Sequence, residues 1–185
     1  GRMKTRELPS FGDLTAAPHR LMFFIGACNV LLAMAWWAGI LAVSRWGGVA
    51  LPTSSIPAGW GHALVMQYQV LPPFMFGFLL TVFPRWLDLP ALTRWHYLPV
   101  GIGLFGGQLL TLAGLLGLPL LAWLGLVLTL AGWLTAMSFL VGLLWRAKQT
   151  NWHAIACIVA LSLGAIGLLL ALAWLYTGDG RLMFA

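Results

Sequence analysis

The sequence has little charge and only two cysteines. Charged residues make up 8% of its 185 residues and hydrophobic residues 61%, against about 25% and 45–50% in soluble domains. A soluble fold of this size could not hide so much apolar surface, and a disordered chain needs the opposite composition. Two cysteines cannot form a disulfide scaffold. The apolar runs are too long for the alternating strands of a membrane β-barrel, so an all-α, polytopic transmembrane helix bundle is predicted.

Acidic residues are the scarcest charged class, and none lies within a long apolar run. The four acids are Glu7, Asp13, Asp88 and Asp179. A proton- or cation-coupled carrier usually places a carboxylate inside the membrane, so a carrier or channel is disfavoured. The chain also has no phosphate-binding loop, nucleophile motif or CxxC pair, so the sequence does not indicate a defined enzymatic activity.

The formal net charge of +6 comes from basic residues at the ends of the apolar runs. This placement is typical of charges that orient membrane helices, and it does not indicate nucleic-acid binding. With the N-terminus inside, eight Lys/Arg residues lie on the inner side: Arg2, Lys4, Arg6, Arg20, Arg85, Arg94, Arg146 and Lys148. Only Arg45 and Arg181 lie outside, so we expect a cytoplasmic N-terminus and a periplasmic C-terminus.

Four charge-free runs contain the expected spans. One crossing needs about 20 residues at 1.5 Å each, so the run 95–145 must hold two helices, with a turn at Gly117-Leu118-Pro119. The predicted spans are 21–43, 62–83, 97–117, 120–145 and 152–176, which form one membrane domain over residues 21–185. Residues 1–20 form a basic, cytoplasmic N-terminal segment.

Small residues and prolines add local detail to the spans. Gly103 and Gly107 are four residues apart on one face, a spacing that lets helix backbones approach closely in lipid. Pro72 and Pro73 remove two backbone donors, so we expect the second span to kink or open there. Such a break is found both at ligand cavities and at purely structural kinks.

His62 is the principal candidate for a cofactor ligand. Met66, Gln69 and Pro73 follow it at helical spacing and so share its face in a regular α-helix. Imidazole and thioether one turn apart suit haem iron or Cu(I). The alternative is ordinary packing, because Met is a common filler of apolar interfaces and His often ends a span. The topology makes His62 the one histidine on the outer side.

The other histidines define a weaker candidate site at the inner face. His19, His96 and His153 sit at the inner starts of the first, third and fifth spans. Cys157 lies one turn after His153, and Cys28 lies at a similar depth on the first span. Together they could form a soft metal site, or the cysteines could be small apolar fillers. Both thiols face the reducing side, so no disulfide is expected.

Several segments resemble the NnrS family of membrane proteins. They are residues 17–24 (Ala-Pro-His-Arg-Leu-Met-Phe-Phe), 62–66 (His-Ala-Leu-Val-Met), 73–81 (Pro-Phe-Met-Phe-Gly-Phe-Leu-Leu-Thr) and 84–87 (Pro-Arg-Trp-Leu). The resemblance covers mainly residues 17–90, with His153-Ala154 as a further match. It departs from the family next to His62, where Gly61 and Ala63 stand and many members have a second histidine and a glutamate.

The resemblance implies a multi-pass protein of the bacterial inner membrane that binds haem b, copper or both. It also implies a link to nitric oxide, either in the response to nitrosative stress or through electron transfer in denitrification. Members have about a dozen helices, so we expect additional membrane helices beside these five, from a continuation or from partner subunits. The alternative function is that of a cofactor-free structural or assembly subunit of a larger membrane complex.

Overall fold

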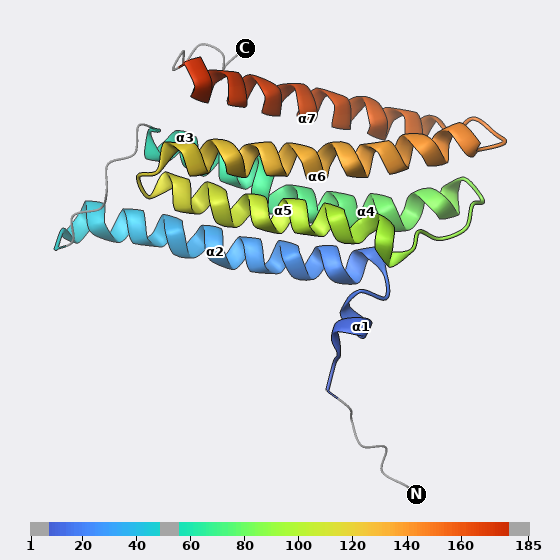
Figure 1. Ribbon diagram of the computed structural model, residues 1–185, viewed down its shortest axis with the longest axis horizontal. Coiled ribbons are helices and arrows are strands. Elements are labelled where there is room, and N and C mark those ends of the chain that lie inside the picture. Colours follow the sequence, from blue (N-terminus) through green and yellow to red (C-terminus); the bar gives the residue numbers. More distant parts are fainter. Residues whose placement is uncertain (1–7, 49–55, 178–185) are drawn as a thin grey trace, which may run out of the picture.

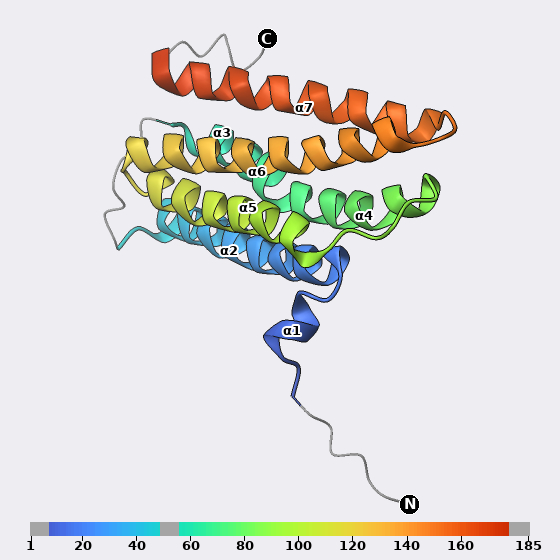
Figure 2. The ribbon, with the colours of Figure 1, turned by 45° about the vertical axis from the view of Figure 1, so that its right-hand side comes forward.

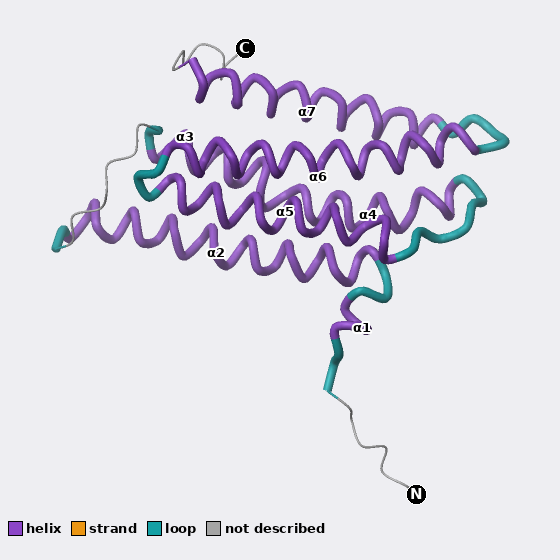
Figure 3. Tube along the Cα trace, viewed as in Figure 1, coloured by secondary structure: helices purple, strands orange, loops and turns teal. Residues whose placement is uncertain are grey.

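The computed structural model describes residues 8–48 and 56–177, and every element within those ranges is helical (Figure 3). The elements are α1 (Phe11–Leu14), α2 (Pro18–Trp46), α3 (Ala58–Val65), the π-helical turn η1 (Met66–Val70), α4 (Leu71–Trp86), α5 (Arg94–Leu115), α6 (Pro119–Arg146) and α7 (Trp152–Thr177).

Five of the described helical segments are long and apolar enough to cross a membrane, as the sequence predicts. They are α2, the continuous segment α3–η1–α4, α5, α6 and α7. The first span begins at Pro18, earlier than expected, because proline suits the first turn of a helix, where its missing N–H costs nothing. The all-α bundle is confirmed, whereas the cytoplasmic location of the N-terminus stays a prediction.

The long helices lie side by side, with α2 and α7 at opposite edges of the bundle (Figures 1 and 2). The most extensive contact is between α5 and α6. A Cβ on Gly103 would lie only 2.9 Å from the Cα of Gly132, and one on Gly107 only 2.9 Å from the Gly125 carbonyl oxygen. The predicted small-residue face on the third span therefore permits close backbone packing. The tight turn that joins the two helices uses Gly117 at φ +115°.

The second span contains a π-helical turn directly before its two prolines. In an α-helix the Gln69 carbonyl would accept a hydrogen bond from residue 73, but Pro73 has no N–H. The side-chain nitrogen of Asn29, on α2, donates to this carbonyl at 2.7 Å instead. The predicted break at Pro72-Pro73 thus takes the form of a π turn in a continuous helical segment.

The N-terminal segment is tied to the bundle through a short helix. Ser10 and Asp13 cap α1 by reciprocal side-chain and backbone hydrogen bonds. The buried hydroxyl of Tyr97, in the first turn of α5, donates to the Thr15 carbonyl at 2.6 Å. These bonds hold α1 beside the start of α2.

Candidate cofactor site

His62 lies in the second turn of α3, half-buried against α2. Its imidazole stacks on the indole of Trp37, with ring centroids 4.2 Å apart and planes 17° apart. Within the described part of the chain its two ring nitrogens make no hydrogen bond. The stacked indole fixes the plane of the imidazole while its nitrogens stay available to a ligand, which is what a metal-binding histidine requires.

An apolar groove adjoins this aromatic pair. It lies between α2 and α5, has a volume of about 430 Å³ and is lined by Trp36, whose ring centroid is 5.7 Å from that of Trp37. The Trp36 indole nitrogen is buried and has no partner among the described residues. An apolar groove of this kind is chemically suited to the apolar face of a planar ligand.

Gly61 precedes His62 at a closely packed position. A Cβ at this position would meet the Leu115 side chain at 3.1 Å and the Trp36 ring at 3.5 Å. The Leu115 side chain would therefore have to shift slightly to admit a larger residue. The structure offers one imidazole at this site within the described residues.

Met66 and Gln69 do not share the same surroundings, although the spacing predicts a common face. Met66 lies one turn after His62 and packs against the apolar core. Gln69 lies within the π turn, and its side-chain nitrogen donates to the hydroxyls of Thr111 at 3.1 Å and Thr129 at 2.8 Å. The extra residue in the π turn shifts the helical phase, so Gln69 points between α5 and α6 rather than along the face of His62.

The other three histidines, which are predicted at the inner face, form no three-residue metal group with His62 among the described residues. His19 begins α2, and Trp37, the stacking partner of His62, follows roughly 27 Å along the same helix. His96 is a helix cap, since its Nδ1 accepts from the backbone N–H of Thr93 at 3.2 Å. His153 is exposed at the start of α7 and lies near the Trp86 ring.

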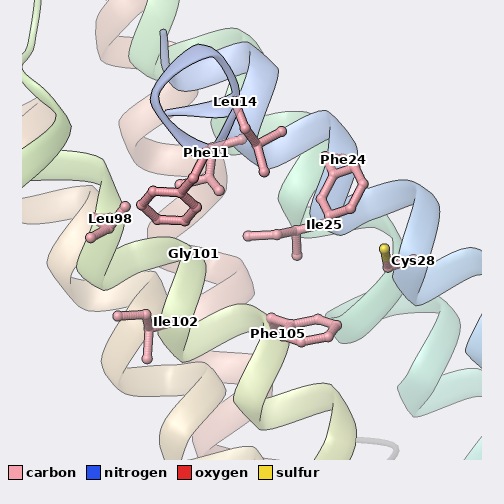
Figure 4. A pocket seen from close by; sticks show the side chains of 10 residues that line it. Phe11, Leu14, Phe24, Ile25, Cys28, Leu98, Gly101, Ile102 and Phe105 are labelled. Carbon is pink, nitrogen blue, oxygen red and sulfur yellow. The ribbon is translucent and has the colours of Figure 1, made fainter. Parts of the chain in front are cut away.

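The two cysteines are also apart. Cys28 lines a second apolar groove, of about 260 Å³, between α1, α2 and α5 (Figure 4). Cys157 lies on α7, at the opposite edge of the bundle from α2 (Figure 1). Both thiols are free. Among the described residues, no three His, Cys, Asp or Glu side chains are grouped so that they could hold a metal ion, and the weak inner site of His153, Cys157 and Cys28 is not assembled.

A buried polar cluster lies in the middle of the bundle, and Gln69 is the only one of its members that the sequence indicates as a candidate. It consists of Asn29, Gln69, Gln108, Thr111 and Thr129, each at most 2% exposed. The sequence does indicate such a cluster, because an amide side chain inside an apolar span needs a polar partner from another helix. Its partners come from four different helical elements and cannot be read from spacing along one helix.

The match to known families agrees with this architecture. The family model described as "NnrS protein" matches residues 13–185. The chain belongs to the NnrS family. No curated protein and no solved structure matches it. The NnrS match extends well beyond the resembling segments of residues 17–90 and includes α5, α6 and α7.

Proposed function

We propose that this NnrS-family protein is a bacterial inner-membrane protein that binds haem b, copper or both through His62, and that it acts in the nitric oxide response or in electron transfer during denitrification. The single observation that carries the proposal is the environment of the His62 side chain. Its ring is held flat against Trp37 while neither nitrogen is used by another described residue.

Some of the residues around His62 fit the binding of haem or copper, and others do not. His62 would supply one nitrogen ligand, and Met66, one turn further along the helix, would supply a thioether. Trp36, which lines the 430 Å³ groove, would pack against the bound group. Gln69 does not fit, because its side chain lies between the threonines of α5 and α6 instead of beside His62. When bound, haem or copper would supply a redox-active metal that binds nitric oxide or passes an electron.

The test is the cofactor content of the purified chain and of three variants, measured in the same membranes. Haem is read from the absorption spectrum and copper from elemental analysis. In His62→Ala the cofactor should be lost, because no other described imidazole lies near this site. In Met66→Leu the cofactor should bind more weakly or show an altered spectrum.

The matched control is His153→Ala, at the other end of the bundle. This histidine is exposed, so its removal should leave the cofactor content unchanged. Unaltered haem and copper in His62→Ala, in protein that does carry a cofactor, would contradict the proposal. Loss in His153→Ala with retention in His62→Ala would move the site to the inner face, where His19, His96 and Cys157 would be tested next.

The second candidate function is that of a cofactor-free structural or assembly subunit. The observation that favours it is the close packing of small residues between α5 and α6, where Gly103 and Gly107 lie against Gly132 and Gly125. Wild-type protein without haem or copper would support this alternative.

We further propose that additional membrane helices pack against these five in the assembled protein. The groove of Figure 4 is a recess of about 260 Å³ between α1, α2 and α5, and side chains of a further helix would fill it, because helices in lipid associate through close packing. A stable, monodisperse monomer of the chain alone in mild detergent would count against additional helices.

A further inference from the structure

Three amide side chains in the middle of the bundle leave their oxygens without a partner. Asn29 on α2 and Gln108 on α5 are 0% exposed, and Gln69 on η1 is 1% exposed. Within the described chain, Oδ1 of Asn29 and Oε1 of Gln69 and Gln108 accept no hydrogen bond. Asn29 lies about 16 Å along α2 from Pro18, close to the middle of the span.

The amide groups of Asn29 and Gln108 cannot be turned round to remove this deficit. The nitrogen of Asn29 donates to the Gln69 backbone carbonyl at 2.7 Å, and the nitrogen of Gln108 donates to the Asn29 backbone carbonyl at 3.2 Å. A backbone carbonyl only accepts. Exchanging nitrogen and oxygen would therefore set two acceptors against each other.

The Thr129 hydroxyl determines the orientation of the Gln69 amide, because its proton is already donated to a backbone carbonyl. Thr129 Oγ1 donates to the Gly125 carbonyl at 2.9 Å, so towards Gln69 it acts as an acceptor, and the Gln69 nitrogen is the donor at 2.8 Å. The reversed amide would leave the nitrogen unpaired instead. In either orientation Gln69 has one polar atom that needs a partner from outside the chain.

The side chains lie next to one another. The Gln108 amide reaches the backbone of Asn29, the Asn29 amide reaches the backbone of Gln69, and the Gln69 amide reaches Thr111, one turn from Gln108. An unpaired buried acceptor destabilises the fold, and buried polar groups without a protein partner are usually satisfied by internal water.

We propose that the cluster is a binding site for internal water, in which water molecules shared between these side chains donate to the amide oxygens of Asn29, Gln69 and Gln108. A cation is the other ligand that neutral oxygens attract, but the five spans contain no carboxylate to balance its charge. An unbalanced charge in the membrane interior is costly. Water satisfies the same oxygens without that cost.

The experiment measures contact between water and these side chains in the intact protein in lipid bilayers. Magnetisation is transferred from water protons to the side-chain amide protons, with detection by proton-detected solid-state NMR. We expect transfer to the amides of Asn29, Gln69 and Gln108. The internal reference is the Trp133 indole N–H, which is equally buried but is paired with the Leu161 carbonyl at 3.1 Å, and it should show none.

Two Gln→Met variants, one inside the cluster and one outside it, distinguish the loss of a cluster acceptor from a general effect of replacing glutamine by methionine. Gln108→Met removes one acceptor, so transfer from water to the Asn29 amide should be reduced. Gln67→Met changes an exposed glutamine two residues before Gln69 and should leave transfer to the cluster unchanged. The comparison of the three amides with Trp133 in the wild-type protein decides the question even if Gln108→Met fails to fold.

Three results would overturn the proposal. Absence of water transfer to all three amides would mean that the cluster is dry. Full transfer to Asn29 in folded Gln108→Met would mean that the two side chains share no water. Saturable chemical-shift changes at the three amides on titration with Na⁺ or K⁺ would replace water with a cation.

Discussion

Substitution of Gly125 by alanine tests the packing of α5 against α6. A Cβ at this position would lie 2.5 Å from both the backbone nitrogen and the hydroxyl of Thr111, and 2.8 Å from the Gly107 carbonyl oxygen. Ordinary contacts begin at 3.4 Å, and two of the three atoms belong to the backbone of α5. Since no rotamer change can relieve such contacts, α5 itself must move away from α6.

The expected cost is that of an overpacked core, about 1–3 kcal/mol of unfolding free energy. Gly142→Ala is the matched control on the same helix, because nothing lies within 4 Å of its added Cβ. Alanine favours a helix over glycine by about 1 kcal/mol, so this control should be neutral or stabilising. Reversible unfolding in mixed detergent micelles gives both values, and Gly125→Ala protein as stable as Gly142→Ala would refute the packing argument.

Three further predictions concern polar groups. Asn29→Val should lower the unfolding free energy by about 1 kcal/mol, because the Gln69 carbonyl loses its donor; unchanged unfolding in micelles would contradict this. The backbone N–H and hydroxyl of Ser10 lower the pKa of Asp13 below 3.8, so this cap is present above that pH and is lost as the pH falls through the lowered value. An NMR titration of Ser10→Ala should show the Asp13 pKa raised towards 3.8, and no change would count against the cap. A single cysteine at Lys148, with both native cysteines removed, should react only from the cytoplasmic side; labelling from the periplasm would reverse the topology.

The spans could be predicted from the sequence because the bilayer acts on each helix separately. A run of about 20 uncharged residues must cross as a helix to satisfy its own backbone, and one long run must turn where Gly117 and Pro119 interrupt it. The form of the break at Pro72-Pro73 could not be predicted in the same way. Two missing donors favour a kink as well as a π turn, and the donor that satisfies the Gln69 carbonyl comes from Asn29 on a different span.

The sequence predicts one residue of the candidate site, His62, but not the side chains that surround it. His62 was identified by its chemistry and its place at the end of a span. Its partner Trp37 lies on another helix, and nothing in the local spacing relates the two. The inner histidines show the same limit, because each begins a span, yet the packing of the spans gives His96 a capping role and leaves His153 exposed.

The π turn accounts for the division of the second span into two environments. In a regular α-helix, residues 62 and 69 would be two turns apart on one face, and Gln69 would extend the surface that His62 and Met66 begin. A π turn bonds each residue to the fifth one along the chain and so carries fewer degrees of rotation per residue. Before the turn, His62 therefore faces Trp37 of α2. Within it, Gln69 faces the threonines of α5 and α6. The candidate cofactor site and the polar cluster are consequently separate sites on one helical segment.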